Sequence, residues 1–172
     1  AVAVLRKFTR LKCALMPYLY SNAVYTHKTG VPTMRAMVLE FPQDIPCASL
    51  DRQYMLGGDL LVAPIFNEES MGEYYLPDGL WTHLLSGETR PGGRWHRESY
   101  DYFSLPLFVR PASLLALGSN EERPDYDYAR GVELHLYQLA DGQEAACAVP
   151  DQEGGIALRA RVWRKGERLT AQ

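Results

Sequence analysis

The chain of 172 residues is 47% hydrophobic, which is enough apolar material for a core and excludes an intrinsically disordered protein. Its 18 basic and 21 acidic side chains give a net charge of −3 without a basic stripe, so a nucleic-acid partner has little support and neutral substrates are expected. No apolar run approaches the roughly 20 residues that span a bilayer, and no basic-then-apolar leader opens the chain, which argues against a membrane partner.

The cysteines are odd in number and widely separated, at Cys13, Cys47 and Cys147. This pattern argues against a disulfide framework and favours a reducing compartment. A cytoplasmic protein is therefore expected.

The segment from Val4 to about Lys28 predicts a helix that Gly30 and Pro32 end. Pro17 lacks an amide hydrogen and its ring opposes the carbonyl four residues earlier, so the helix is expected to kink there or to be two abutting helices. Apolar residues at three-and-four spacing predict one buried face, made of Val4, Phe8, Leu11, Leu15, Tyr18 and Leu19.

Two apolar runs follow, at Thr33–Phe41 and Leu60–Ile65. A run that is apolar on both faces is typical of a strand in a parallel sheet, and the second run is entered through a turn at residues 57–59 and stopped by Pro64. Between them, Pro42–Ser49 predicts an irregular surface loop and Asp51–Leu56 a short turn. This order of helix, strand, connection and strand predicts part of a barrel of alternating strands and helices, and not a whole domain.

After Ile65 the pattern changes to short extended segments separated by turn residues, which predicts antiparallel β-structure. The expected strands are Glu73–Leu76, Leu80–Leu85, Phe103–Val109 and Ser113–Leu117, with a polar, glycine-rich loop at residues 87–93.

A third section begins near Glu121. There Val132–Tyr137 alternates, Asp141 and Gly142 predict a hairpin turn, and Glu144–Val149 returns. The apolar residues at 156, 158, 160 and 162 alternate with Arg159, Arg161 and Trp163, which predicts a strand with one face in water.

Ordered sequence blocks resemble glycoside hydrolase family 31, in particular its bacterial α-xylosidases. The blocks are Leu11–Cys13, Leu15–Tyr20, Gly30–Pro32, Met34–Met37, Glu40–Pro42, Asp51–Gly57, Leu61–Pro64, Tyr75–Trp81, Arg94–His96, Ser104–Pro106, Val109–Arg110, Leu114–Gly118 and Arg123–Tyr126. They cover nearly the whole chain and match the C-terminal third of the family.

The resemblance implies a retaining α-glycosidase on a (β/α)8 barrel, with two aspartates as nucleophile and general acid/base. The family's motifs for both aspartates, and its sugar-binding histidine, lie upstream of these blocks and have no counterpart here. The chain also begins at Ala1 without an initiator methionine, as a fragment of a longer enzyme would. We therefore expect no catalytic residue in this chain and leave its substrate-binding residues unassigned.

Glu40 and Asp59 are the carboxylates that invite pairing, because retaining glycosidases need two carboxyl groups about 5 to 5.5 Å apart. In parallel strands, however, Glu40 follows its strand and Asp59 precedes its own, which places them near opposite ends of the sheet. Glu40 is then expected to be a loop or ion-pair residue, and Asp59 a turn former.

Arg35 lies in an otherwise apolar strand, where a guanidinium is costly to bury without partners. An acidic neighbour is expected. The main interpretation is a structural ion pair, and the alternative is a residue that supports the sugar site.

Other chemistry has little support in the sequence. The four histidines have no ligand-like spacing with one another or with the cysteines, so neither a metal nor a cofactor is expected; they are His27, His83, His96 and His135. Trp81, Trp95 and Trp163 are able to stack on sugar rings, but packing is the commoner role of an aromatic residue in a strand.

The predicted fold class is α/β followed by all-β. Residues 1–66 are expected to form the last helix and strand part of a (β/α)8 barrel, residues 67–122 an antiparallel β-sandwich, and residues 123–172 the start of a second β-domain. The expected function is that of the C-terminal part of an enzyme that hydrolyses terminal α-xylosides, inactive alone, with the upstream part of the barrel as its partner. An α-glucosidase and a non-catalytic carbohydrate-binding or interaction module remain the alternatives, and a homo-oligomer is left open.

Overall fold

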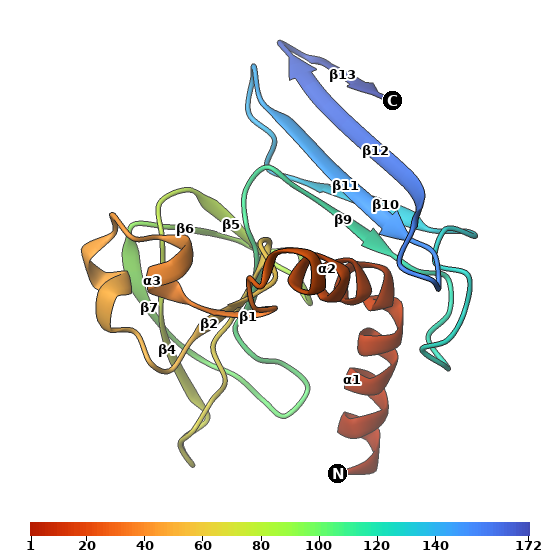
Figure 1. The fold of residues 1–172 in the computed structure, drawn as a ribbon. Coiled ribbons are helices and arrows are strands. Elements are labelled where there is room, and N and C mark those ends of the chain that lie inside the picture. Colours follow the sequence, from red (N-terminus) through yellow and green to blue (C-terminus); the bar gives the residue numbers. More distant parts are fainter. The chain divides into compact units, whose positions relative to one another are not determined.

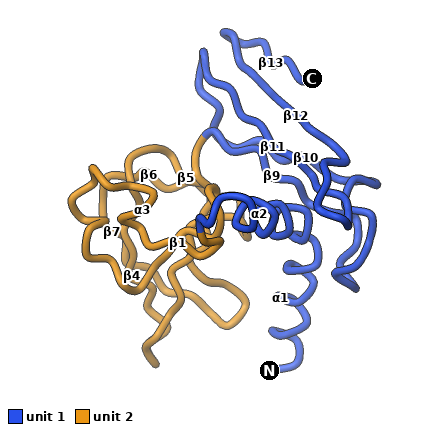
Figure 2. Tube along the Cα trace, viewed as in Figure 1, with its two compact units in different colours: residues 1–31, 112–172 blue, residues 32–111 orange.

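The computed structural model describes residues 1–172. The chain forms two compact units, shown in two colours in Figure 2: Ala1–Val31 with Ala112–Gln172, and Pro32–Pro111. We call them unit 1 and unit 2 and describe each by itself. No helix in the structure is long and apolar enough to cross a membrane.

Unit 1 begins with two helices, α1 (Val2–Ala14) and α2 (Met16–Thr29), which abut at Leu15 (Figure 1). Pro17 lies in the first turn of α2, where its missing amide hydrogen costs nothing, and this confirms the predicted break in the helix. Gly30 ends α2 in the left-handed conformation, with φ at 76°, and donates its amide to the Thr26 carbonyl oxygen at 2.8 Å.

Unit 1 continues with five strands in two antiparallel sheets. In the first sheet β9 (Ser113–Leu117) pairs with β10 (Glu133–Tyr137), and in the second β12 (Ile156–Lys165) lies between β11 (Glu144–Pro150) and β13 (Arg168–Ala171). The prediction of a hairpin at Asp141 and Gly142 is wrong. The strands on either side of this turn do not pair with each other, since β10 pairs with β9 and β11 pairs with β12.

The end of α1 is tied to the segment that follows β9. The backbone amide of Gly118 donates to the Ala14 carbonyl oxygen at 2.7 Å, and the Tyr126 hydroxyl donates to the Cys13 carbonyl oxygen at 2.7 Å. Carbonyls in the last turn of a helix lack the usual partners within the helix, and these two bonds supply hydrogen bonds to two of them from the segment after β9. Burial raises the pKa of Tyr126 to about 12.

Unit 2 is built from an antiparallel six-stranded sheet and a two-stranded sheet. The six strands, in spatial order, are β1 (Met34–Ala36), β2 (Tyr54–Leu56), β3 (Leu60–Val62), β8 (Leu107–Val109), β5 (Leu80–His83) and β6 (Thr89–Pro91). The smaller sheet pairs β4 (Met71–Leu76) with β7 (Arg94–Ser99), and between β1 and β2 run the short helix α3 (Met37–Glu40) and the 3₁₀ helix η1 (Ile45–Ser49).

Both sheets of unit 2 share one core of large side chains. Trp81 and Tyr74 are completely buried, and the Tyr74 ring lies 5.2 Å from the ring of Phe108 on the opposite sheet, measured between centroids. Trp81 donates its indole N–H to the Pro77 carbonyl oxygen at 2.7 Å, so its one polar group is satisfied. This is the antiparallel β-architecture expected for the middle of the chain.

The prediction of parallel strands at the start of unit 2 is wrong. Residues 34–36 and 60–62 both pair antiparallel, with β2 between them, and the run from Met37 turns into α3 instead of extending the strand to Phe41. Successive residues of a strand point to opposite faces of the sheet, and Leu60 and Leu61 are both buried because β3 is an inner strand of a covered sheet. An apolar run of this kind occurs whether the neighbouring strands are parallel or antiparallel. The described fold is therefore mostly antiparallel β with few helices.

Candidate functional site

Glu40, at the end of α3, lies between two arginines of unit 2. One carboxylate oxygen accepts a hydrogen bond from Arg35 Nη1 on β1, and the other accepts one from Arg110 Nη1 at 3.2 Å. Arg35 also donates its Nε–H to the Pro32 carbonyl oxygen at 2.9 Å. The Arg35 residue is only 8% exposed, so its charge depends on these partners.

Arg110 completes this charged cluster of Arg35, Glu40 and Arg110. Its guanidinium lies 4.7 Å from the centre of the Phe41 ring and also donates to the Gly58 carbonyl oxygen at 3.3 Å. The cluster therefore joins β1, α3 and the β2–β3 turn to the end of β8.

The expected acidic neighbour of Arg35 is confirmed, since it is Glu40. Glu40 and Asp59 do not lie at opposite ends of a parallel sheet, contrary to the prediction, because Arg110 contacts both Glu40 and the turn that holds Asp59. Both carboxylate oxygens of Glu40 are nevertheless occupied by guanidinium groups, which suits a structural ion pair better than proton transfer to a sugar.

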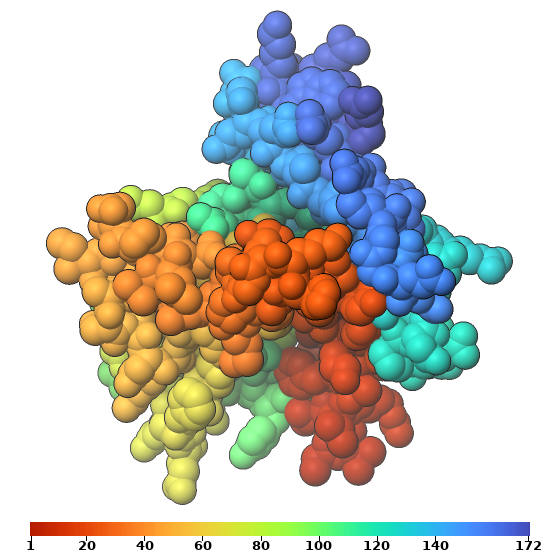
Figure 3. All heavy atoms as spheres, viewed as in Figure 1, coloured from red at the N-terminus to blue at the C-terminus, as the bar shows by residue number.

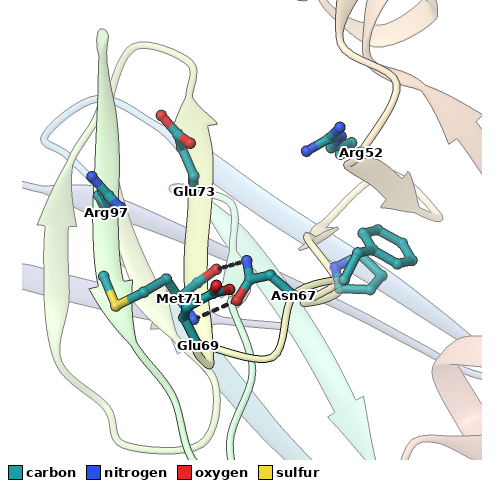
Figure 4. Close-up of a pocket in the computed structure, with 8 residues that line it drawn as sticks. Arg52, Asn67, Glu69, Met71, Glu73 and Arg97 are labelled. Carbon is teal, nitrogen blue, oxygen red and sulfur yellow. Dashed lines mark hydrogen bonds between the residues drawn. The ribbon is translucent and has the colours of Figure 1, made fainter.

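A hollow of about 490 Å³ lies elsewhere on unit 2, beside the loop that joins β3 to β4 (Figure 4). It is lined by Arg52, Pro64, Phe66, Asn67, Glu69, Met71, Glu73 and Arg97. Asn67 closes the loop, because its side-chain amide donates to the Met71 carbonyl oxygen at 2.7 Å and accepts the Met71 amide at 3.0 Å.

The charges around this hollow are balanced and separate. Glu73 and Arg97 are cross-strand partners on β4 and β7, Arg52 faces them from the segment before β2, and none of the three forms an ion pair. Phe66 stands exposed at the rim, with 72% of its surface in water. Such a surface can hydrogen-bond a neutral polar ligand.

Comparisons with known proteins identify the family. The family model described as "Glycosyl hydrolase family 31 C-terminal domain" matches residues 30–115, and that described as "Alpha-xylosidase YicI, C-terminal domain" matches residues 127–172. The chain belongs to glycoside hydrolase family 31.

Two curated family 31 relatives cover most of the chain. An α-xylosidase, XylQ of Lactiplantibacillus pentosus, is 37% identical over 98% of this chain and 22% of its own length. "Alpha-glucosidase 2" of Bacillus thermoamyloliquefaciens is 32% identical over 88% of this chain and 19% of its own length. The chain thus spans about a fifth of the length of the curated relatives it matches.

A solved family 31 structure has the same fold over this region. The Flavobacterium johnsoniae dextranase FjDex31A, solved with glucose, superimposes with a TM-score of 0.82 at 25% identity, covering 94% of this chain and 21% of that one.

The tryptophans of this family 31 chain differ in burial. Trp81 is core, as predicted, whereas Trp95 on β7 is 54% exposed and its ring lies 5.9 Å from that of Tyr75. Trp163 on β12 is half-buried. Packing is thus confirmed for Trp81.

Sequence reasoning missed a second charged cluster, around Glu98 on β7. One oxygen of Glu98 accepts Arg90 Nε at 2.7 Å, and the other accepts the hydroxyls of Tyr74 and Tyr100 at 2.9 and 3.0 Å. Burial acts to raise the pKa of Glu98, but these hydrogen bonds outweigh it and hold the pKa below its ordinary value. The strand that carries Glu98 reads Arg-Trp-His-Arg-Glu-Ser, which has no apolar alternation to reveal it.

Proposed function

We propose that the full-length protein hydrolyses terminal, non-reducing α-xylosides with net retention. The observation that carries this proposal is the 37% identity to the α-xylosidase XylQ over nearly the whole chain. In such a reaction a carboxylate forms a glycosyl-enzyme intermediate while a second carboxyl group first donates and then accepts a proton. An α-glucosidase is the second candidate within the family, supported by the relative at 32% identity.

The part played by this chain is that of a scaffold without catalytic residues. Glu40 is held between two arginines, and Glu98 between an arginine and two tyrosine hydroxyls, so neither carboxylate is free to attack a sugar. The catalytic aspartates are expected on the upstream polypeptide.

The helices of residues 1–31 are proposed to complete a (β/α)8 barrel that lies upstream. The family 31 C-terminal domain match begins at residue 30, so these helices precede it, and we move the barrel boundary from residue 66 to about residue 30. The boundary at residue 122 is kept, supported by the gap between the matches at residues 115 and 127.

The upstream polypeptide is also the partner that fits the exposed apolar side chains. Val2 and Leu5 on α1 are 69% and 70% exposed, and the surface of this helix, red in Figure 3, is open on the face shown. In unit 2, Leu39 and Ile45 are 62% and 86% exposed. Apolar groups gathered on short segments in this way are typical of surfaces that another part of a protein covers.

A non-catalytic carbohydrate-binding role is the rival from another class, favoured by the hollow at Phe66, Arg52 and Glu73. Neutral oligosaccharides suit its balanced charges. A cytoplasmic location stays a prediction from the sequence, and the oligomeric state stays open.

The test is hydrolysis by the full-length protein of p-nitrophenyl α-xyloside and p-nitrophenyl α-glucoside, with the anomer of the released sugar followed by NMR. We expect a higher kcat/KM for the xyloside and an α-anomer as the first product. A β-anomer would contradict retention, and a preference for the glucoside would favour the second candidate.

A further inference from the structure

Strand β12 in unit 1 presents a basic face to water. Its apolar residues at 158, 160 and 162 are half-buried against the core of the unit, so the residues that alternate with them point outward. These outward residues are Arg159, Arg161, Trp163 and Lys165.

The strands on either side of β12 extend this face. Lys165 is opposite Arg168 on β13, which places Arg168 on the outward side. On β11, Glu144 is the one outward acidic residue, and it pairs with Arg161 at 3.1 Å. Outside the turn between β12 and β13, this face therefore carries four basic side chains and one acidic side chain. The face is thus positively charged although the net charge of the chain is −3.

A hollow of about 570 Å³ lies on this face, between the basic side chains. Ala146 and Ala148 on β11 are opposite Arg161 and Arg159, so small methyl groups form a floor from which the two guanidinium groups rise. Gln172 also lines the hollow. Arg159 forms no ion pair, and its charge is available to a ligand.

The chemistry of this hollow matches an acidic sugar. A guanidinium group binds a carboxylate or sulfate through two parallel hydrogen bonds. Alternate residues of a strand are about 6.6 Å apart, so Arg159 and Arg161 can bind charged groups on one saccharide. The methyl floor suits the apolar face of a sugar ring, whereas a single half-buried aromatic, Trp163, gives a nucleic acid no row of stacking platforms.

We propose that the outward face of β11, β12 and β13 is a binding site for acidic oligosaccharides, separate from the hydrolytic site of the full-length enzyme. It does not depend on which neutral glycoside that enzyme cleaves.

The test is titration of the 172-residue chain, and of the full-length protein, with oligogalacturonate by calorimetry. Arg159→Gln/Arg161→Gln should weaken binding at least tenfold. The matched control, Arg6→Gln/Lys12→Gln on α1, removes the same net charge from exposed positions and should change the Kd less than twofold. Isomaltotriose, a neutral sugar, should not bind at this face.

Three results would overturn the proposal. The first is no binding of oligogalacturonate, and the second is equal weakening by the two double variants. The third is equal or tighter binding of single-stranded DNA or polyglutamate, which would make the face a general anion site or a nucleic-acid site. Circular dichroism of each variant shows whether the sheet is intact.

Discussion

The two units of this chain achieve burial in different ways. Unit 2 encloses its largest side chains completely, among them Trp81, Tyr74 and Phe108, and ties charged residues to this core. Unit 1 packs Ala145 and Val149, together with the rings of Tyr126 and Tyr128, in its cores and leaves the other face of its second sheet in water. Unit 2 is therefore expected to respond strongly to single changes, and unit 1 mainly where its helices are tied to its strands.

The largest effect is expected from Arg35→Met in unit 2. Removing one partner of a buried ion pair typically costs about 3 to 5 kcal/mol, because the other charge is left without its partner. Arg110 still contacts Glu40, which places the expected loss of unfolding free energy near the lower value. Urea unfolding of the 172-residue chain measures this.

Arg52→Met is the control for Arg35→Met. It removes an exposed arginine of the same unit that forms no ion pair, and a surface change of this kind usually stays within about 0.5 kcal/mol. If Arg35→Met left the melting temperature of the full-length enzyme unchanged and removed most of its turnover, Arg35 would belong to the sugar site instead.

A smaller effect is expected in unit 1 from Tyr126→Phe. The change deletes the hydroxyl that donates to the Cys13 carbonyl oxygen, which keeps its backbone partner, so the expected cost is that of one hydrogen bond, about 0.5 to 1.5 kcal/mol. Tyr102→Phe, at a residue that is 84% exposed, should change nothing measurable in the same denaturation experiment. Equal unfolding midpoints for the two variants would show that the tie between α1 and the strands is not needed for stability.

The smallest effect, a pH dependence, is expected at Glu98 in unit 2. Its folded pKa is held below the ordinary value of 4.5, so the folded state favours the charged form. The stability that it contributes is fully present above pH 4.5 and is lost as the pH falls through the lowered folded pKa. Thermal melts between pH 7 and 3 should fall less steeply for Glu98→Gln than for the unmodified chain, and Glu69→Gln should match the unmodified chain.

Local signals in the sequence predicted much of the fold. Pro17 correctly predicted the break between α1 and α2, and the strand at Ser113–Leu117 has the predicted bounds. Strand direction was not predictable, because Leu60 and Leu61 are buried on both faces in either kind of sheet. Contacts between residues distant in the chain were not predictable either. Arg35 indicated an acidic partner, and Glu40 is close to it in sequence, but Arg110 comes from 70 residues beyond Glu40.

The most direct test of the scaffold role is turnover by the 172-residue chain alone. Purified chain is incubated with p-nitrophenyl α-xyloside and p-nitrophenyl α-glucoside, and the assay is repeated with the upstream polypeptide supplied. We expect no turnover above background from the chain alone, because the family's motifs for the nucleophile and the general acid/base have no counterpart in it, and we expect activity when the upstream part is added. Turnover by the chain alone that Glu40→Gln abolishes would contradict the scaffold role and make Glu40 a catalytic residue.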